Sequence, residues 1–331
     1  MHKCMTIAAV TAVVLACVSG TQADMVMDWV TVGDPGNAGE LSGGSVPGGF
    51  GPDRICGAVE YTYNIGRHEV TNSQYAEFLN AAAASDPNGL YNTSMGSGYG
   101  GITRSGSPDS YTYSPILGRG NMPVNSVSWY DTLRFANWLH NGQPTGAQDP
   151  STTEDGAYDM SLGSGVVRKP GAQVFLPSED EWYKAAYYKG GSADAGYWGY
   201  PTQSDTPPTA EDLPGTDFVN GSANYDWAVG DLTYVGSYTA KPSDSAYRTF
   251  DQGGNVWEWN EAVVHGSYRG LRGGSFVYTY GSTLHAAYRS YGSYPSCEDR
   301  SIGFRVAEVP EPATITLLAF GAVGVLGRRR R

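Results

Sequence analysis

The sequence predicts an α+β domain built from short helices, short strands and long glycine-rich loops. Of the 331 residues, 45 are glycine and 19 are proline, and these residues favour turns over regular elements. A few segments alternate apolar and polar residues, as strands do, and others place a capping residue before a helical apolar period. No internal repeat or long linker is visible, which favours a single domain.

The first elements are predicted in the N-terminal third. Residues 59–65 alternate apolar and polar side chains, which predicts a strand. Thr71 or Asn72 is placed to cap a helix that extends to Ala84, because short polar side chains accept from the free N–H groups of a first turn. Residues 85–120 are rich in glycine, serine and tyrosine without a period, so we expect a long loop there.

Two further helices carry capping signals. Ser128 is expected to cap a helix over residues 129–139. Residues 174–182 predict a strand, a turn and the start of a helix, where Ser178 and Glu181 form a capping box. Two segments are expected to close the domain as strands: residues 271–278 and 303–307.

The N-terminus has the parts of a secretory signal. Lys3 supplies the positive start, residues 6–18 are apolar and small residues follow, so we expect signal peptidase to remove residues 1–23. Val14–Cys17 also approaches a lipobox, which leaves a lipoprotein as the alternative. Residues 24–56, which include a stretch rich in glycine and proline, are expected to form a loose lead-in.

The C-terminus, residues 309–331, has the parts of a second targeting segment. Val309–Pro312 precedes the apolar run Ala313–Leu326, and Arg328–Arg331 end the chain. Fourteen apolar residues span about 21 Å as a helix, short of the roughly 30 Å hydrocarbon core, so a short anchor with its arginines in the cytoplasm is one interpretation. The three parts in this order closely resemble a PEP-CTERM sorting signal. That resemblance implies a Gram-negative bacterium, processing by an exosortase, and export to the envelope or the extracellular matrix, with only a transient inner-membrane anchor.

The core between the two ends, residues 24–309, is strongly acidic. It contains all but one of the 33 acidic residues but only 16 of the 21 basic ones, which gives a formal charge of −16. Such a surface repels nucleic acid and anionic lipid headgroups, so we expect neither as a partner, and membrane contact only through the C-terminal segment. It suits a hard cation such as calcium.

Residues 250–276 carry the most informative motif. Trp257 and Trp259 flank Glu258, with glycine pairs at 253–254 and 273–274. Together with R-G-G-S, A-Y-R and G-F-R further on, this segment resembles the core signature of the formylglycine-generating enzyme (sulfatase-modifying factor) family. The resemblance extends over residues 57–308, including E-V-T-N and P-V-x-x-V-S-W earlier in the chain. It implies that family's α+β fold, a relative of the C-type-lectin fold with little regular secondary structure.

The family's chemistry looks absent from this chain. Its members oxidise a sulfatase cysteine to formylglycine with copper held by two cysteines, and the resemblance places those positions at Tyr278 and Thr283, after the matching Ser275. Phenol and hydroxyl oxygens cannot replace thiolates for cuprous copper, so copper is not expected. His285 lies nearby but has no second histidine at a metal-binding spacing.

The motif arginines have two interpretations. They either line a groove that grips an anionic or peptide ligand, or form a structural network with Glu258, Glu261 and neighbouring carbonyls. The residues concerned are Arg272, Arg289 and Arg305.

The resemblance also implies two structural calcium sites. The first falls on Asn224, the carbonyl of Tyr225 and Asp231, with Asp226 as the rival acid. The second falls on one short segment, where two carboxylates and two carbonyls within eight residues suit a hard cation. Its expected ligands are Asp251, the carbonyls of Gly254 and Val256, and Glu258. The alternative for Glu258 is a buried acid paired with an arginine.

Cys56 and Cys297 are the only cysteines of the core, and either form one disulfide or remain unpaired thiols. No hydrolase or nucleotide-binding motif occurs. The favoured hypothesis is an exported, surface-sorted family member that has no oxidase activity and works as a binding or structural module, with a matrix polysaccharide or an envelope protein as its ligand. The alternatives are an enzyme that modifies sulfatases or performs another oxidation in the same groove, and a maturation factor that binds sulfatases without oxidising them.

Overall fold

The computed structural model describes residues 25–239, 241 and 243–310. The predicted signal peptide (1–23) and almost all of the C-terminal sorting segment lie outside these residues. Within the described part, the helices are α1 (Asn72–Ala82), α2 (Trp129–His140) and α3 (Glu179–Tyr187), with short 3-10 helices at Thr93–Gly96, Met160–Gly165 and Gly281–Leu284. None of them is long and apolar enough to cross a membrane.

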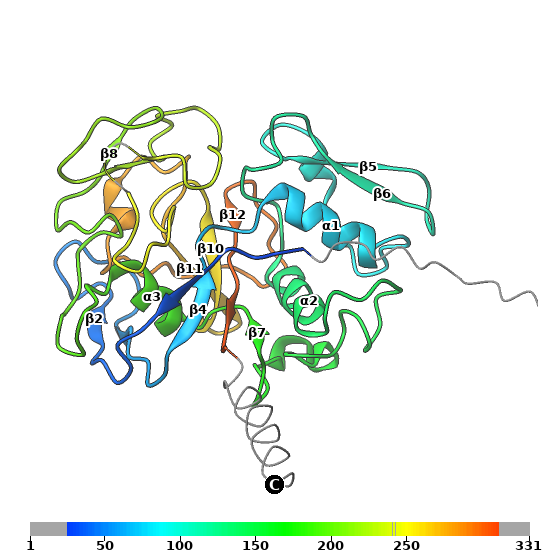
Figure 1. Cartoon of the computed structure of the whole chain (residues 1–331), viewed down its shortest axis with the longest axis horizontal. Helices are drawn as coiled ribbons and strands as arrows, with labels where there is room; N and C mark the ends of the chain where they lie inside the picture. Colours follow the sequence, from blue (N-terminus) through cyan, green and yellow to red (C-terminus); the bar gives the residue numbers. More distant parts are fainter. Residues whose placement is uncertain (1–24, 240, 242, 311–331) are drawn as a thin grey trace, which may run out of the picture.

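Two small sheets form the centre of the domain (Figure 1). The first is antiparallel in the order β1-β4-β13-β7, from Trp29–Val32, Tyr63–Gly66, Ala307–Glu308 and Val174–Phe175. The second has the order β11-β10-β12, from Tyr268–Arg272, Trp257–His265 and Ile302–Gly303, with β10 antiparallel to β11 and parallel to β12. Helices α1 and α2 lie on one side of these strands and α3 on the other.

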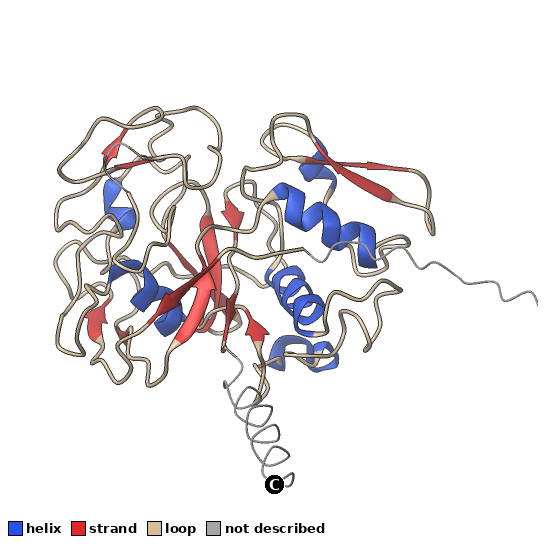
Figure 2. Ribbon diagram, viewed as in Figure 1, coloured by secondary structure: helices blue, strands red, loops and turns tan. Residues whose placement is uncertain are grey.

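The other strands form two-stranded ribbons between long loops, which dominate the drawing in Figure 2. The ribbons are β2 (Glu40–Ser42) with β3 (Arg54–Cys56), β5 (Ile102–Ser105) with β6 (Thr112–Pro115), and β8 (Thr209–Ala210) with β9 (Ser222–Ala223). The expected α+β architecture with little regular structure is confirmed.

All three helices begin at the predicted caps. The hydroxyl of Thr71, rather than Asn72, accepts from the N–H of Gln74, and Ser128 and Ser178 make the same contact in α2 and α3. In each case the third helical residue accepts from the cap's own N–H, which completes a capping box. Helix α1 ends at Ala82, two residues before the expected end.

Four predictions need correction. The expected strand 303–307 is instead two short strands, β12 and β13, and residues 304–306 between them lie in neither. Residues 85–120 are not one loop, since they contain β5 and β6, which the sequence hides because only Ile102 and Tyr113 of these strands are buried. The expected strand 59–65 is shorter and begins at Tyr63. The expected strand 271–278 ends at Arg272, because Gly273 and Gly274 adopt positive φ.

Residues 24–56 are not a loose lead-in. Strand β1 pairs with β4 over four residues at the edge of the central sheet, and β2 pairs with β3. The side chains of Val30 and Val32 are buried in the main core, although the polar and glycine-rich residues after them mask the strand pattern in the sequence. The segment is therefore part of the folded domain.

Val32 tests this contribution. Replacing the fully buried Val32 by alanine should lower the free energy of unfolding by roughly 1–3 kcal/mol, because the cavity cannot close completely. The matched control is Val26→Ala, whose side chain is 82% exposed and should change stability by less than about 0.5 kcal/mol. Denaturant unfolding measures the stability of both variants. If Val32→Ala were as stable as Val26→Ala, β1 would not stabilise the domain.

Candidate functional site

The groove that the resemblance implies begins directly after β11. Ser275 is buried, and its hydroxyl has no hydrogen-bond partner among the described residues. Tyr278 is 41% exposed, whereas Thr283 is buried and donates its hydroxyl to the carbonyl of Tyr280 at 2.9 Å. The Nδ1 atom of His285 accepts from the N–H of Ala287 at 3.0 Å.

These residues do not assemble into a metal site. Across the residues that the structure describes, no three His, Cys, Asp or Glu side chains lie together as a ligand set. The ring of His285 packs edge-on against Tyr200, and burial lowers its pKa.

Tyr278 instead belongs to a group of aromatic rings, which we call the aromatic row. Its ring meets Trp257 edge-on at 5.3 Å, and Trp257 lies 6.0 Å from Tyr288. Phe50 stacks on Tyr288 at 4.9 Å and meets Tyr291 at 5.1 Å. Three of the five rings are exposed to solvent: Phe50, Tyr278 and Tyr291.

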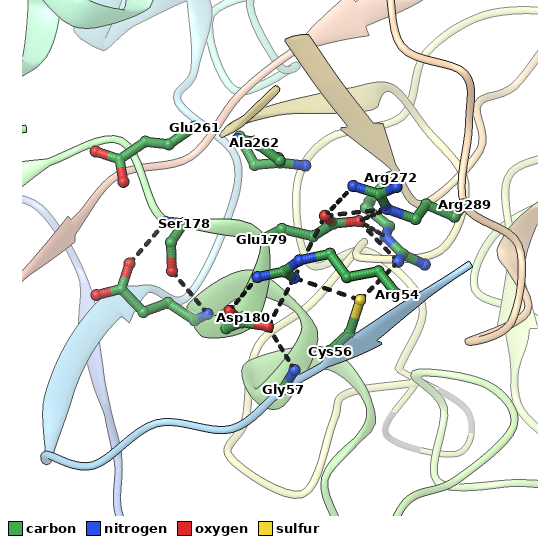
Figure 3. Close-up of polar contacts among 12 residues, drawn as sticks. Arg54, Cys56, Gly57, Ser178, Glu179, Asp180, Glu261, Ala262, Arg272 and Arg289 are labelled. Carbon is green, nitrogen blue, oxygen red and sulfur yellow. Dashed lines mark hydrogen bonds and ion pairs between the residues drawn. The ribbon is translucent and has the colours of Figure 1, made fainter. Parts of the chain in front are cut away.

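A buried ion cluster, drawn in Figure 3 and called the arginine cluster below, lies next to Tyr288 of this row, since Arg272 donates to the carbonyl of Tyr288 at 3.0 Å. Glu179, in the first turn of α3, accepts from Arg272 at 2.8 and 3.0 Å and from Arg289 at 2.8, 2.9 and 3.1 Å. Arg54 approaches Glu179 at 3.5 Å and makes its main pair with Asp180, at 2.5 and 2.8 Å. Glu179 is 2% exposed and Arg272 is fully buried.

Burial alone would raise the pKa of Glu179. The guanidinium groups of Arg272, Arg289 and Arg54 overcome this effect and lower that pKa to about 2. Glu179 is therefore ionised at all ordinary pH values, and its two oxygens are fully committed to the arginines.

The second buried pair joins Glu258 and Arg305. Arg305 donates to both carboxylate oxygens at 2.6 Å, and the indole N–H of Trp182 donates to one of them at 2.7 Å. Arg305 and Glu258 are both fully buried. The three motif arginines thus form the structural network that was one of the two interpretations.

The sequence analysis predicted only some of the acidic partners of the three motif arginines. Glu258 pairs with Arg305, but Glu261 pairs with Arg168, which also pairs with Glu181. The partner of Arg272 and Arg289 is Glu179, to which the sequence analysis gave no role. A signal was present: a capping box needs one acid, and this turn carries three, Glu179, Asp180 and Glu181.

In the first expected calcium site, only one of the expected ligand atoms is free to bind a cation. The side-chain oxygen of Asn224 is buried without a partner in the described residues, which is what a metal ligand requires. The Asp231 carboxylate, however, accepts a bidentate pair from Arg119 at 2.8 and 2.9 Å. The carbonyl of Tyr225 accepts from the N–H of Ala228 at 3.1 Å, and Asp226 lies in the left-handed region.

The second expected site does not fit. Both oxygens of Glu258 are already hydrogen-bonded within the buried pair, so none is free for a metal. Asp251 accepts from the N–H of Gly236 at 2.6 Å, and burial raises its pKa to about 6. Gly254, in the turn before Val256, packs so closely on the backbone of Asn224 that a Cβ atom would lie 2.5 Å from its carbonyl oxygen. The two expected sites are therefore in contact.

Cys56 and Cys297 are unpaired thiols, so the disulfide expected as one of two alternatives does not form. The sulfur of Cys56 is fully buried, 3.4 Å from Arg272 and 3.5 Å from Arg54, and burial raises its pKa. Cys297 packs against the main core, whereas Cys56 belongs to a separate cluster around α3.

Glu179 should be decisive for stability. Glu179→Gln leaves two buried guanidinium groups without their carboxylate and should cost about 3–5 kcal/mol. Because the folded-state pKa lies below the unfolded one, this stabilisation is present above pH 4.5 and is lost as the pH falls toward 2. Urea unfolding from pH 7 to 2.5 should show the acid loss in the wild type and a smaller one in Glu179→Gln. The matched control is Glu77→Gln, at an exposed glutamate, which should be as stable as the wild type. If Glu179→Gln were also as stable as the wild type at pH 7, the role of Glu179 would be contradicted.

Residues 54–309 match the model of the sulfatase-modifying factor enzyme 1-like domain, and residues 308–331 match the PEP-CTERM protein-sorting motif. Among solved structures, variable protein 1 of Treponema denticola is 19% identical with a TM-score of 0.50, covering 85% of this chain and 95% of that one. PvdO from Pseudomonas aeruginosa is 20% identical (TM-score 0.47; 85% and 94% covered), and CarF is 21% identical (TM-score 0.46; 86% and 99% covered).

The likeness to the Treponema protein shows the fold alone, because the identity is low. The family match spans more than half of the chain. The protein belongs to the formylglycine-generating enzyme family of sulfatase-modifying factor domains, in an exported form that carries a PEP-CTERM sorting motif.

Proposed function

We propose that this protein is a binding module of the cell envelope or extracellular matrix that does not perform copper-dependent oxidation. One observation carries the proposal: the two positions at which the family resemblance implies copper ligands hold Tyr278 and Thr283. Thr283 is buried with its hydroxyl already bonded, and Tyr278 presents an aromatic ring to solvent.

The chemistry of the neighbouring groups supports the same conclusion. Cuprous copper prefers thiolate ligands, and the sulfur nearest to the groove's arginines, Cys56, is buried with a raised pKa. Cys297 packs in another part of the core. Two thiols placed in this way supply no shared site for copper.

The two ends of the chain are consistent with this role. The PEP-CTERM motif implies sorting to the envelope through an exosortase, and a removed signal peptide would bring the chain across the inner membrane. The acidic core disfavours nucleic acid, which leaves a polysaccharide or an envelope protein as the ligand. The exposed rings of the aromatic row are suited to contact either.

The oxidase activity can be tested directly. The full chain is incubated with a sulfatase peptide that contains C-x-P-x-R, cuprous copper and oxygen, and the peptide is followed by mass spectrometry. We expect no conversion of the cysteine, together with retention of the protein on exopolysaccharide or envelope material from the same cells. Conversion of the peptide would establish the enzyme alternative, and tight peptide binding without conversion would favour a sulfatase maturation factor.

We further propose that calcium binds at Asn224, whose side-chain oxygen is buried without a partner among the described residues. Calcium at a hundredfold excess over its dissociation constant would stabilise the fold by about 2.7 kcal/mol relative to a chelator. Thermal unfolding with calcium and with EGTA should therefore differ in the wild type. The variant Asn224→Ala should lose the calcium-dependent shift in Tm, whereas a wild type insensitive to calcium would contradict the proposal.

A further inference from the structure

A cavity of about 360 Å³ lies between two segments that are far apart in the sequence, residues 94–100 and 298–300. Its lining includes none of the groove residues and none of the aromatic row. It is nevertheless close to them, since Tyr99 in its wall packs against Phe276 at 5.1 Å, next to Ser275. The volume falls within the range of sites for small molecules, about 300–1,000 Å³.

The walls of this cavity are fixed by hydrogen bonds. The carbonyl of Tyr99 accepts from Asn125 at 2.8 Å and from Arg119 at 2.9 Å. On the opposite wall, the N–H of Ser126 donates to the carbonyl of Asp299 at 3.0 Å. A ligand would therefore enter a preformed site and would not have to order its walls.

The cavity is lined by hydrogen-bond donors and acceptors that are not all paired within the described part of the protein. The guanidinium of Arg300 lies over the rings of Tyr99 and Trp227, at 5.0 and 5.7 Å, and makes no ion pair with a described carboxylate. Asp299 accepts from Ser301 through one oxygen only, and Glu298 accepts from Asn92 through one oxygen only. One strong donor group and two free carboxylate oxygens thus remain.

The presence of both an arginine and two carboxylates favours a ligand without charge. An anion would meet two carboxylates, and a cation would meet Arg300. A neutral polyol satisfies both kinds of group, because each hydroxyl can donate to a carboxylate and accept from a guanidinium. The serine hydroxyls at positions 94 and 97 extend the same pattern. Trp227, 39% exposed, lies outside the lining and packs beside Tyr99, with the guanidinium of Arg300 over its ring.

We propose that this cavity binds a neutral sugar unit of an extracellular polysaccharide. Glu298 and Asp299 accept from the sugar hydroxyls, and Arg300 donates to its oxygens. The inference rests on the proposed function as a binding module and names the chemical class of the ligand and its site.

The test uses the full chain and a panel of neutral gluco-, galacto- and manno-oligosaccharides, with oligogalacturonate as the acidic comparison, in isothermal titration calorimetry. We expect at least one neutral oligosaccharide to bind and the acidic one to bind more weakly. Arg300→Ala and Asp299→Asn should each weaken binding about tenfold, or about 1.4 kcal/mol. Arg248→Ala, a change at another exposed arginine, should leave binding unchanged. Thermal unfolding of each variant checks that the fold is intact.

The outcomes separate this inference from the proposed function. If a neutral oligosaccharide binds but only Tyr278→Ala weakens it, the ligand sits on the aromatic row, and the inference is overturned while the binding role stands. Preference for oligogalacturonate, or binding of envelope protein with no oligosaccharide binding, also overturns it. Copper-dependent peptide oxidation would remove the proposed function instead, whatever the calorimetry shows.

Discussion

One buried carboxylate, that of Glu179, holds together the segments that surround the groove. Arg272 immediately precedes the glycine pair and Ser275, Arg289 follows Tyr288, and Arg54 lies in β3, a few residues after Phe50. The segment around Arg54 is far in sequence from the two that carry Arg272 and Arg289, and all three converge on the first turn of α3. The positions of Phe50 and Tyr288, which lie in these segments and stack on each other, depend on this convergence.

A buried ion cluster is costly unless every charge is satisfied. Here the guanidinium groups exceed what Glu179 can accept, and main-chain carbonyls take up the difference. Arg272 donates to the carbonyls of Ala286 and Tyr288 at 3.0 Å, and Arg289 donates to that of Pro52 at 3.3 Å. The donors that might have gripped an anionic ligand are thereby used to fix loops. The arginine cluster therefore has a structural role, and the proposed ligand contacts are assigned to the exposed aromatic rings and to the cavity lined by Glu298, Asp299 and Arg300.

The starts of the three helices could be predicted from the sequence, because they depend only on residues close together in the chain. Thr71, Ser128 and Ser178 cap their helices as expected, because a capping box is complete within four residues. The family resemblance supplied the fold. Strand β1 was missed because its partner β4 lies about thirty residues further on, and nothing in its own four residues reveals the pairing.

The candidate site was less predictable for the same physical reason. Whether an acid binds a metal or an arginine is decided by residues distant in sequence: Arg119 takes Asp231, and Arg305 with Trp182 takes Glu258. The assignment of Tyr278 and Thr283 to the family's copper positions rests on the resemblance and a two-residue gap after Tyr278, and it stays a prediction. The most direct measurement is therefore a cuprous-copper titration of the intact protein against a chromophoric chelator. The account predicts that the chain retains no stoichiometric copper, whereas one tightly held ion per chain, lost on Cys56→Ser or Cys297→Ser, would contradict it.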